Sequence, residues 1–198
     1  TFPVAMAAAE DGRILVTEKF GQVRLIDSDG QLAEEPIANF EVKSFNESGL
    51  IGIALFPDFQ ETGEFVVTYT PDQDREHLYL SKLRLAEDGT AEALQAPWIE
   101  LPSRPEVGRH FGGNVVFTDE HMYVALSDIL DKRTAQQTTN LYGSILRYNL
   151  DGTIPADNPL GPNNPIYAYG FRNCFDLDAS PEGRIYCAEN GERRHDHI

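Results

Sequence analysis

Basic side chains are scarce in this sequence. It carries 16 Lys and Arg residues against 32 Asp and Glu residues, which gives a formal net charge of −16 at pH 7. Because nucleic acids and anionic membranes are bound through basic surfaces, this balance excludes a general nucleic-acid binder or a membrane-surface binder. No apolar run approaches the roughly 18 residues that a membrane-spanning helix needs. No membrane span is therefore predicted.

Cysteine is also rare, with only Cys174 and Cys187 in the chain. The two residues flank a turn signal at 179–183, so a hairpin there would bring the two thiols close together. A disulfide would suit an oxidising compartment such as the periplasm or the extracellular space. The alternative is a pair of small buried hydrophobic side chains with no bond between them. The sequence leaves both interpretations open.

The composition is that of a folded domain. Hydrophobic residues make up 41% of the 198 residues and aromatic residues 10%, which excludes a disordered acidic tail. The chain starts at Thr1 with no initiator Met and no signal peptide, and its last residues, 193–198, resemble a motif cut part-way. We therefore expect residues 1–198 to be a single domain, truncated at the C-terminus and without its N-terminal signal segment.

Strand patterns dominate the chain. Short stretches rich in β-branched or aromatic residues and bounded by turn residues occur at 13–17, 22–26, 63–70, 78–85 and 121–126. Convincing helical periodicity is absent, and the alanine-rich stretch 5–10 is too short to be trusted as a helix. The predicted fold class is all-β.

A weak repeat lies over these strands. Each unit places a turn after its first strand and an Asp-Gly pair after its third, with a period of roughly 45 to 60 residues. The turns are at 11–12, 57–58, 118–120 and 181–183, and the Asp-Gly pairs at 29–30, 88–89 and 151–152. This spacing favours the blades of a β-propeller, about three to four of them here, over a β-sandwich, which does not usually repeat a unit internally. The long connections 129–142 and 153–165 are where binding residues are expected.

One candidate acid–base pair stands out. His110 precedes the paired glycines Gly112 and Gly113, whose bare backbone would let a flat ligand approach closely. Asp128 follows the next strand, and in an antiparallel pair the start of one strand and the end of its neighbour share an edge. Asp128 is therefore a candidate to orient His110 as a general base, although it could instead only cap a turn.

Two further loops carry polar groups. Arg172 offers a planar fork to a carboxylate, and Asn173 provides both a donor and an acceptor beside it. The segment from Glu189 to Gly191 ends a strand in a turn whose carbonyl groups could face a hard cation such as calcium.

Together these motifs resemble one family. In order and spacing they are similar to the soluble, pyrroloquinoline-quinone (PQQ)-dependent glucose and aldose sugar dehydrogenases, and the resemblance extends over essentially the whole chain. The motifs that carry it lie at 49–59, 109–114, 135–136, 143–159, 166–173 and 189–191.

The resemblance implies a six-bladed propeller that binds PQQ and calcium and oxidises the anomeric hydroxyl of an aldose, with hydride passing to the quinone. It implies that His110 is the general base, that Asp128 partners it, and that Arg172 contacts the reactive end of the cofactor. The other residues that match cofactor contacts are Glu47, Asn173, Asn190 and Gly191. Main-chain oxygens of Gly191 and Glu192 match the calcium ligands.

The chain also departs from the family pattern near the expected cofactor. Glu192 and Cys174 stand where Pro is common, and Ser144 stands where Lys is common. Of the basic residues near the motifs, Arg109 and Arg172 are expected to help hold an anionic cofactor, and Arg193 and Arg194 to be solvated. His195 and His197 with Asp196 could suggest a transition-metal site, but a solvated chain end is preferred.

Two other functions compete with the enzyme. The propeller is also similar to that of hedgehog-interacting-type proteins, which are binding modules without redox chemistry. The two cysteines and the sequon Asn46-Glu47-Ser48 favour that alternative, and the site residues favour the enzyme. The other competing function, and the third candidate in all, is that of a divergent quinoprotein acting on another alcohol or sugar-like substrate. For the enzyme we expect a sugar substrate, an external electron acceptor, a possible homodimer and a periplasmic or secreted location.

Overall fold

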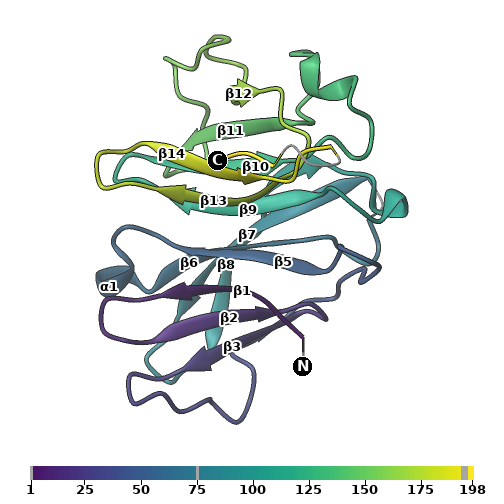
Figure 1. Cartoon of the computed structure of the whole chain (residues 1–198). Helices are drawn as coiled ribbons and strands as arrows, with labels where there is room; N and C mark the ends of the chain where they lie inside the picture. The colour runs from purple at the N-terminus through teal and green to yellow at the C-terminus, as the bar shows by residue number, and fades with distance from the viewer. Residues whose placement is uncertain (1, 75, 193–195) are drawn as a thin grey trace. The chain divides into compact units, whose positions relative to one another are not determined.

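The computed structural model describes residues 2–74, 76–192 and 196–198 (Figure 1). The chain divides into two compact units, Thr1–Leu101 and Pro102–Ile198. Both consist almost entirely of antiparallel strands, which confirms the all-β prediction.

The first unit contains two four-stranded antiparallel sheets. In both sheets the strand order in space follows the order in sequence, so each is a simple meander of the kind found in propeller blades. The first sheet contains β1 (Pro3–Ala8), β2 (Ile14–Glu18), β3 (Gln22–Ile26) and β4 (Ala38–Asn39). The second contains β5 (Leu50–Leu55), β6 (Glu64–Tyr69), β7 (His77–Leu85) and β8 (Ala91–Pro102), with the short helix α1 (Phe59–Thr62) between β5 and β6.

The second unit contains one complete four-stranded meander and one hairpin. The meander contains β9 (Gly112–Phe117), β10 (His121–Leu126), β11 (Ser144–Asn149) and β12 (Ile166–Tyr169). The hairpin contains β13 (Cys174–Ala179) and β14 (Ile185–Glu189). Short 3-10 turns lie at Pro105–Val107 and Thr134–Gln136.

The predicted turns and strands agree with these elements. The first turn of each repeat joins β1 to β2, β5 to β6, β9 to β10 and β13 to β14, and each Asp-Gly pair follows the third strand of a sheet. The alanine-rich segment 5–10 lies mostly in strand β1, whose residues from Ala5 to Ala8 pair with Thr17 to Ile14. Strand pairing thus decides a segment whose alanines alone would suit a helix.

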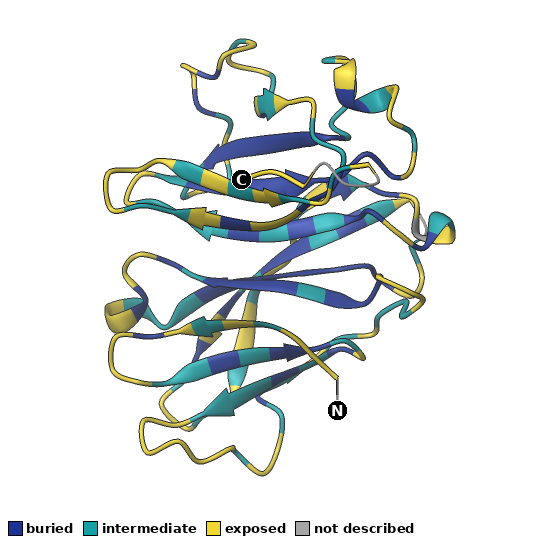
Figure 2. Ribbon diagram, in the orientation of Figure 1, coloured by how far each residue is buried: buried dark blue, intermediate teal, exposed yellow. Residues whose placement is uncertain are grey.

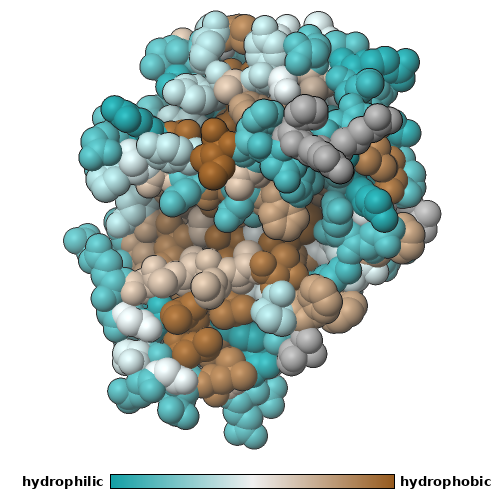
Figure 3. Space-filling view, viewed as in Figure 1, coloured by the Kyte–Doolittle hydropathy of each residue, from teal (hydrophilic) through white to brown (hydrophobic). Residues whose placement is uncertain are grey.

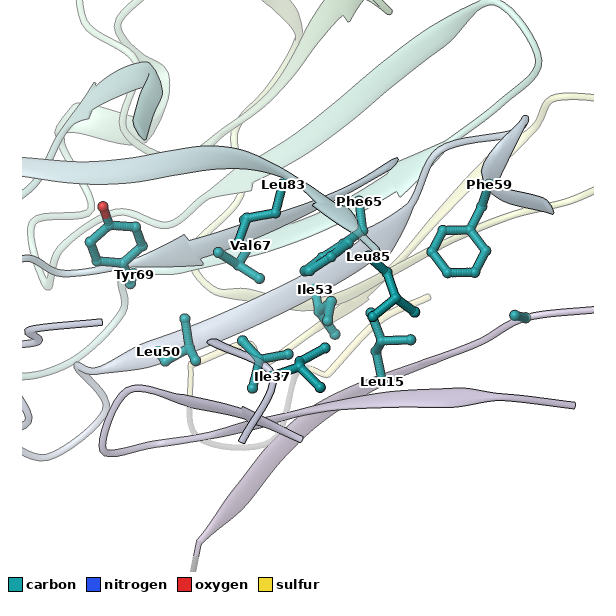
Figure 4. Close-up of a cluster of buried hydrophobic side chains, with 12 residues drawn as sticks. Leu15, Ile37, Leu50, Ile53, Phe59, Phe65, Val67, Tyr69, Leu83 and Leu85 are labelled. Atoms are coloured by element: carbon teal, nitrogen blue, oxygen red, sulfur yellow. The ribbon is translucent and has the colours of Figure 1, made fainter. Parts of the chain in front are cut away.

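The core of the first unit lies between its two sheets. Leu15 of the first sheet is fully buried and shares a cluster with Leu50 and Phe65 of the second (Figure 4). Val23 of the first sheet is also fully buried and belongs to the same cluster. Burying a side chain of this size contributes about 1.5 to 3 kcal/mol to folding. The strands of this unit differ in burial. Figure 2 shows that β6 is buried along most of its length, whereas β1 is largely exposed.

A smaller core lies between the meander and the hairpin of the second unit. It joins Tyr123 and Ala125 of β10 and Ile145 of β11 to Cys174 and Leu177 of β13. This packing sets the hairpin against β9 and β10, and so brings the loop before β13 to the ends of those strands.

Candidate functional site

His110 and Asp128 are joined by a hydrogen bond. Asp128 Oδ1 lies 2.7 Å from His110 Nδ1, and both side chains are buried. The contact follows from strand pairing, because Gly112 near the start of β9 lies opposite Leu126 at the end of β10. Asp128 Oδ1 also accepts the main-chain N–H of Leu130 at 3.0 Å, so the carboxylate that faces the imidazole is held from two sides.

The backbone around this pair has an unusual conformation. His110, Ile129 and Leu130 have positive φ angles of 59°, 50° and 62°. Side chains other than glycine adopt this region rarely, and such residues concentrate at functional sites. The three residues lie immediately beside the His110–Asp128 contact.

Gly112 has a structural explanation that the sequence did not reveal. A Cβ at this position would lie 2.4 Å from the carbonyl oxygen of Ala125 and 2.9 Å from the backbone of Ser127. The glycine is therefore required by the close approach of β10, whether or not a ligand comes near. The sequence suggested that this glycine lets a ligand approach the backbone. Packing against β10 already explains a glycine at position 112 without a ligand.

Arg172 and Asn173 are held on both sides by the main chain. The carbonyl of Arg172 accepts the N–H of Asp128 at 2.8 Å, and the carbonyl of Asn173 accepts the N–H of Asn190 at 2.9 Å. The Arg172 N–H donates to Glu189 Oε1 at 2.6 Å, and its guanidinium donates to the carbonyl of Asn190 at 2.8 Å. The three sequence motifs that contain His110–Asp128, Arg172–Asn173 and Glu189–Gly191 therefore form one hydrogen-bonded group.

A pocket of about 290 Å³ opens beside this group. Among the residues that line it are Asp128, Arg172, Glu189, Gly191 and Glu192, all from motifs that the sequence analysis singled out. His110 and Asn173 are not among the lining residues; they are buried beside it. The pocket thus has one wall from each of the three motifs.

Lys132 and Gln136 line the same pocket but were not predicted as site residues. The sequence feature that could have pointed to them is the long connection 129–142, which was expected to carry binding residues. Its other cation, Arg133, hydrogen-bonds the Asp131 carboxylate and holds the pKa of Asp131 down to about 2. Lys132 lies at the opening, with its Nζ 4.0 Å from Glu192 Oε2.

The pocket offers two cations to an anionic quinone. Arg172 and Lys132 supply positive charge, and a planar guanidinium is well matched to carboxylate groups. Three carboxylates also line the pocket, those of Asp128, Glu189 and Glu192, and the first two already accept hydrogen bonds from the protein. A tricarboxylate ligand would therefore pair with Arg172 and Lys132 beside carboxylates that the protein has partly engaged.

A calcium ion fits less completely. Gly191 and Glu192 line the pocket, and main-chain and carboxylate oxygens are the hard ligands that calcium takes. The Gly191 N–H donates to Asp196 Oδ1 at 3.0 Å, which shapes this turn. Across the described residues, however, no group of three or more His, Cys, Asp or Glu side chains is placed to hold a metal. Calcium here would depend on main-chain oxygens and on oxygens of a bound ligand.

The remaining predicted residues belong to other segments or lie outside the described residues. Glu47 is exposed in the turn before β5, in the first unit, and Arg109 is exposed beside His110. Arg193, Arg194 and His195 lie outside the described residues. His197 pairs with Glu189 through the main chain and also lines the pocket.

Cys174 and Cys187 form a disulfide, with a Cα–Cα distance of 5.7 Å. The antiparallel pairing of β13 and β14 brings them together across the predicted hairpin. This decides between the two alternatives that the sequence left open. Because Cys174 directly follows Asn173, the bond also ties this loop to β14.

None of the helices in the described part of the chain has the length and apolar character needed to cross a membrane.

Comparison with known proteins places the chain in a family. The family model of the Glucose / Sorbosone dehydrogenases matches residues 1–198. The aldose sugar dehydrogenase YliI of Escherichia coli is 27% identical over 207 residues, covering 99% of this chain and 55% of that protein. The chain spans about half the length of the curated relatives it matches in this family.

Solved structures confirm the fold. A structure described as a putative oxidoreductase (glucose dehydrogenase) of Thermus thermophilus matches 98% of this chain and 60% of its own, with a TM-score of 0.87 and 29% identity. The PQQ-bound form of the aldose sugar dehydrogenase of Streptomyces coelicolor matches with a TM-score of 0.82 and 24% identity, over 98% of this chain and 58% of that one. The fold is that of part of a β-propeller, as predicted.

The predicted resemblance to hedgehog-interacting proteins is also found. The mouse hedgehog-interacting protein is 25% identical over 207 residues, covering 86% of this chain and 29% of that protein.

Proposed function

The chain belongs to the glucose and sorbosone dehydrogenase family, and we propose that it provides the proton-abstracting part of a PQQ-dependent aldose dehydrogenase. The observation that carries the proposal is the buried His110–Asp128 pair, which lies hydrogen-bonded beside a pocket lined by Arg172 and Lys132. A neutral imidazole oriented by a carboxylate is a general base suited to an alcohol proton.

His110 takes the proton of the anomeric hydroxyl. Its Nδ1 faces Asp128, so Nε2 is the atom that accepts this proton. The Asp128 carboxylate keeps the ring in the required tautomer and stabilises the imidazolium that forms. Loss of the proton and of a hydride from C1 converts the aldose to its lactone. The bound quinone supplies the two-electron acceptor for that hydride.

Residues of the second unit hold the cofactor in this proposal. Arg172 pairs with a cofactor carboxylate or the reactive carbonyl, and Asn173 and Asn190 add hydrogen bonds. Main-chain oxygens of Gly191 and Glu192 would hold calcium, which would supply Lewis-acid polarisation of the quinone. Lys132 is proposed as a second cation for the carboxylates, and a cofactor contact by Glu47 stays a prediction from the family resemblance.

Reconstitution tests the proposal directly. The full-length protein is incubated with PQQ and calcium, and reduction of a dye acceptor is followed with a panel of aldoses. We expect sugar-dependent reduction that is lost in His110→Gln, whose side chain is polar but cannot act as the base. Sugar-dependent reduction that survives His110→Gln would remove His110 from the role of base.

The second candidate is a binding propeller of the hedgehog-interacting type. The Cys174–Cys187 disulfide and the similarity to the mouse protein favour it. Failure of the folded protein to bind quinone in the same experiment would favour this candidate over the enzyme. Its ligand would then be a protein partner rather than a sugar.

The disulfide also supports the proposed location. Disulfides persist in oxidising compartments, so we propose a periplasmic or secreted protein. The electrons taken from the sugar pass to an external acceptor. A homodimer and a single propeller domain over residues 1–198 stay predictions.

A further inference from the structure

Ser127 and Asn173 form a buried hydrogen bond beside the candidate site. Ser127 follows the last residue of β10 and Asn173 precedes the first residue of β13, so they are 46 residues apart in sequence. The Ser127 hydroxyl donates to Asn173 Oδ1 at 2.8 Å. Ser127 is fully buried and Asn173 is 5% exposed, so water competes little for this bond.

The bond decides which end of the Asn173 amide is available. Oδ1 is occupied by Ser127, and within the described residues no acceptor takes a hydrogen bond from Nδ2. Nδ2 is not among the fully buried polar atoms that lack a partner, so it reaches accessible space. Asn173 therefore keeps its acceptor turned to Ser127 and its two N–H donors turned away from Ser127.

The Asn173 backbone is held independently of Ser127. Its carbonyl accepts the Asn190 N–H at 2.9 Å, and the next residue, Cys174, is bonded to Cys187. Loss of the Ser127 hydroxyl would leave these restraints in place. The freedom regained would be rotation of the amide about its last side-chain bond, which interchanges the positions of oxygen and nitrogen.

We propose that Ser127 is a positioning residue that orients the Asn173 amide so that its NH₂ group donates to an oxygen of the bound quinone. The proposal rests on the proposed function, because it takes PQQ as the ligand. An anionic quinone presents carbonyl and carboxylate oxygens, which are acceptors only. An amide free to rotate would spend part of its time with Oδ1 toward these oxygens, where the two repel each other.

The test is equilibrium binding of PQQ, with calcium, to the full-length apo-protein, followed by quenching of tryptophan fluorescence. We expect Ser127→Ala to raise the Kd about fivefold to tenfold, the effect of one misdirected hydrogen bond. Ser81→Ala is the matched control, because Ser81 of β7 is also fully buried and its hydroxyl also forms a buried hydrogen bond, 3.2 Å from Tyr69 Oη, in a strand that carries no candidate site residue. We expect its Kd to stay within about twofold of the wild-type value.

A double-mutant cycle separates positioning from general damage. If Ser127 acts through Asn173, Ser127→Ala should have no further effect on the Kd in an Asn173→Ala background. Equal effects of Ser127→Ala in both backgrounds would overturn the proposal. So would an unchanged Kd in Ser127→Ala alone. Wild-type protein that binds no PQQ would overturn the proposed function itself, and this inference with it.

Asn173→Asp provides a second variant if Ser127→Ala does not fold. The new carboxylate can still accept from Ser127, but its other oxygen replaces the NH₂ donor. We expect about a tenfold or larger rise in the Kd for PQQ, more than Asn173→Ala produces, because two acceptors would face each other. An Asn173→Asp Kd equal to or below the wild-type value would show that the amide donor is not used.

Discussion

The Asp128 carboxylate accepts two hydrogen bonds, from His110 Nδ1 at 2.7 Å and from the main-chain N–H of Leu130 at 3.0 Å. Asp128→Asn is nearly the same shape but carries no charge to stabilise an imidazolium. We expect kcat for sugar-dependent dye reduction to fall by about a hundredfold or more.

Asp131→Asn is the matched control for this change. Asp131 lies in the same loop, but its carboxylate pairs with Arg133 rather than with His110. Its substitution should leave kcat within about twofold of wild type. Equal losses in both variants would mean that the loop, and not the His110–Asp128 pair, supports the reaction.

Gly112 allows a separate prediction about stability. An Ala side chain there would lie 2.4 Å from the Ala125 carbonyl oxygen and would also have to adopt a φ of about 73°. We expect Gly112→Ala to lower the free energy of unfolding by about 3 kcal/mol, measured by urea denaturation.

Gly183→Ala isolates the backbone part of that effect. Gly183 has a φ of 79°, but nothing lies within 4 Å of the Cβ that would be added. We expect Gly183→Ala to lower the free energy of unfolding by about 1 kcal/mol. If the two variants are equally stable, the close approach of β10 does not explain Gly112.

The β13–β14 hairpin is the element that the disulfide supports. Cys174 and Cys187 are separated by 13 residues, and a cross-link of this size stabilises the folded state by about 3 kcal/mol. The double substitution of both cysteines by Ala should lower the denaturation midpoint. It should also raise the Kd for PQQ, because Cys174 follows Asn173.

Reduction of the wild-type protein checks this prediction without a mutation. A reducing agent should shift the wild-type midpoint to that of the double variant and leave the double variant unchanged. A double variant as stable as the oxidised wild type would contradict the stabilising role of the bond.

The β6–β7 loop provides a pH-dependent contribution. Asp74 accepts the Glu76 N–H and hydrogen bonds from Tyr79 and His77, and these lower the pKa of Asp74 from 3.8 to about 2. A lowered carboxyl pKa stabilises the folded state above the unfolded value. That contribution is lost as the pH falls from about 4 toward 2.

The free energy of unfolding of Asp74→Asn should therefore fall less steeply between about pH 4 and pH 2 than that of wild type. At pH 6 the variant should be less stable than wild type, and near pH 2 the difference should shrink. Denaturation curves at both pH values measure this. A stability difference that is the same at pH 6 and pH 2 would show that the ionised Asp74 carboxylate does not stabilise the fold.

The whole chain exposes apolar side chains in both units. Met6 is 74% exposed and Val4 45% on β1, and Phe175 is 63% exposed on β13. Figure 3 shows hydrophobic side chains of the β1 strand on the surface of the first unit. Large apolar side chains exposed to this extent favour contact with other protein surface.

We expect residues 1–198, produced alone, to self-associate. Sedimentation velocity should show a weight-average mass that rises with concentration. Replacing Met6 and Phe175 with Gln should lower that association and leave the circular dichroism spectrum unchanged. A monomer at all concentrations would contradict the prediction.

The local sequence pattern was sufficient to predict much of this fold. The alternation of apolar residues and the turn residues between strands predicted strands β2, β3, β6, β7 and β10 and the blade repeat, because these depend on neighbours close in sequence. The segment 5–10 shows the limit. Its alanines carry no strong preference for a strand, and pairing with β2 decides its conformation.

Antiparallel geometry also predicted that Asp128 would lie near His110. Residue types and the resemblance to the sugar dehydrogenases then selected the candidates Arg172, Asn173, Gly191 and Glu192. The cysteine pairing stayed open, because spacing alone does not show whether two thiols face each other. The hairpin register settled it.

The remaining features needed the packed structure. The Ser127–Asn173 bond joins residues 46 positions apart, and Lys132 lines the pocket because the loop after β10 folds back beside Arg172. Gly112 is required by the backbone of a neighbouring strand. Such contacts depend on how separate segments pack in three dimensions, and no periodicity along the chain encodes them. Residue types and their order therefore define the fold and the chemistry, and tertiary packing determines how the side chains are oriented for it.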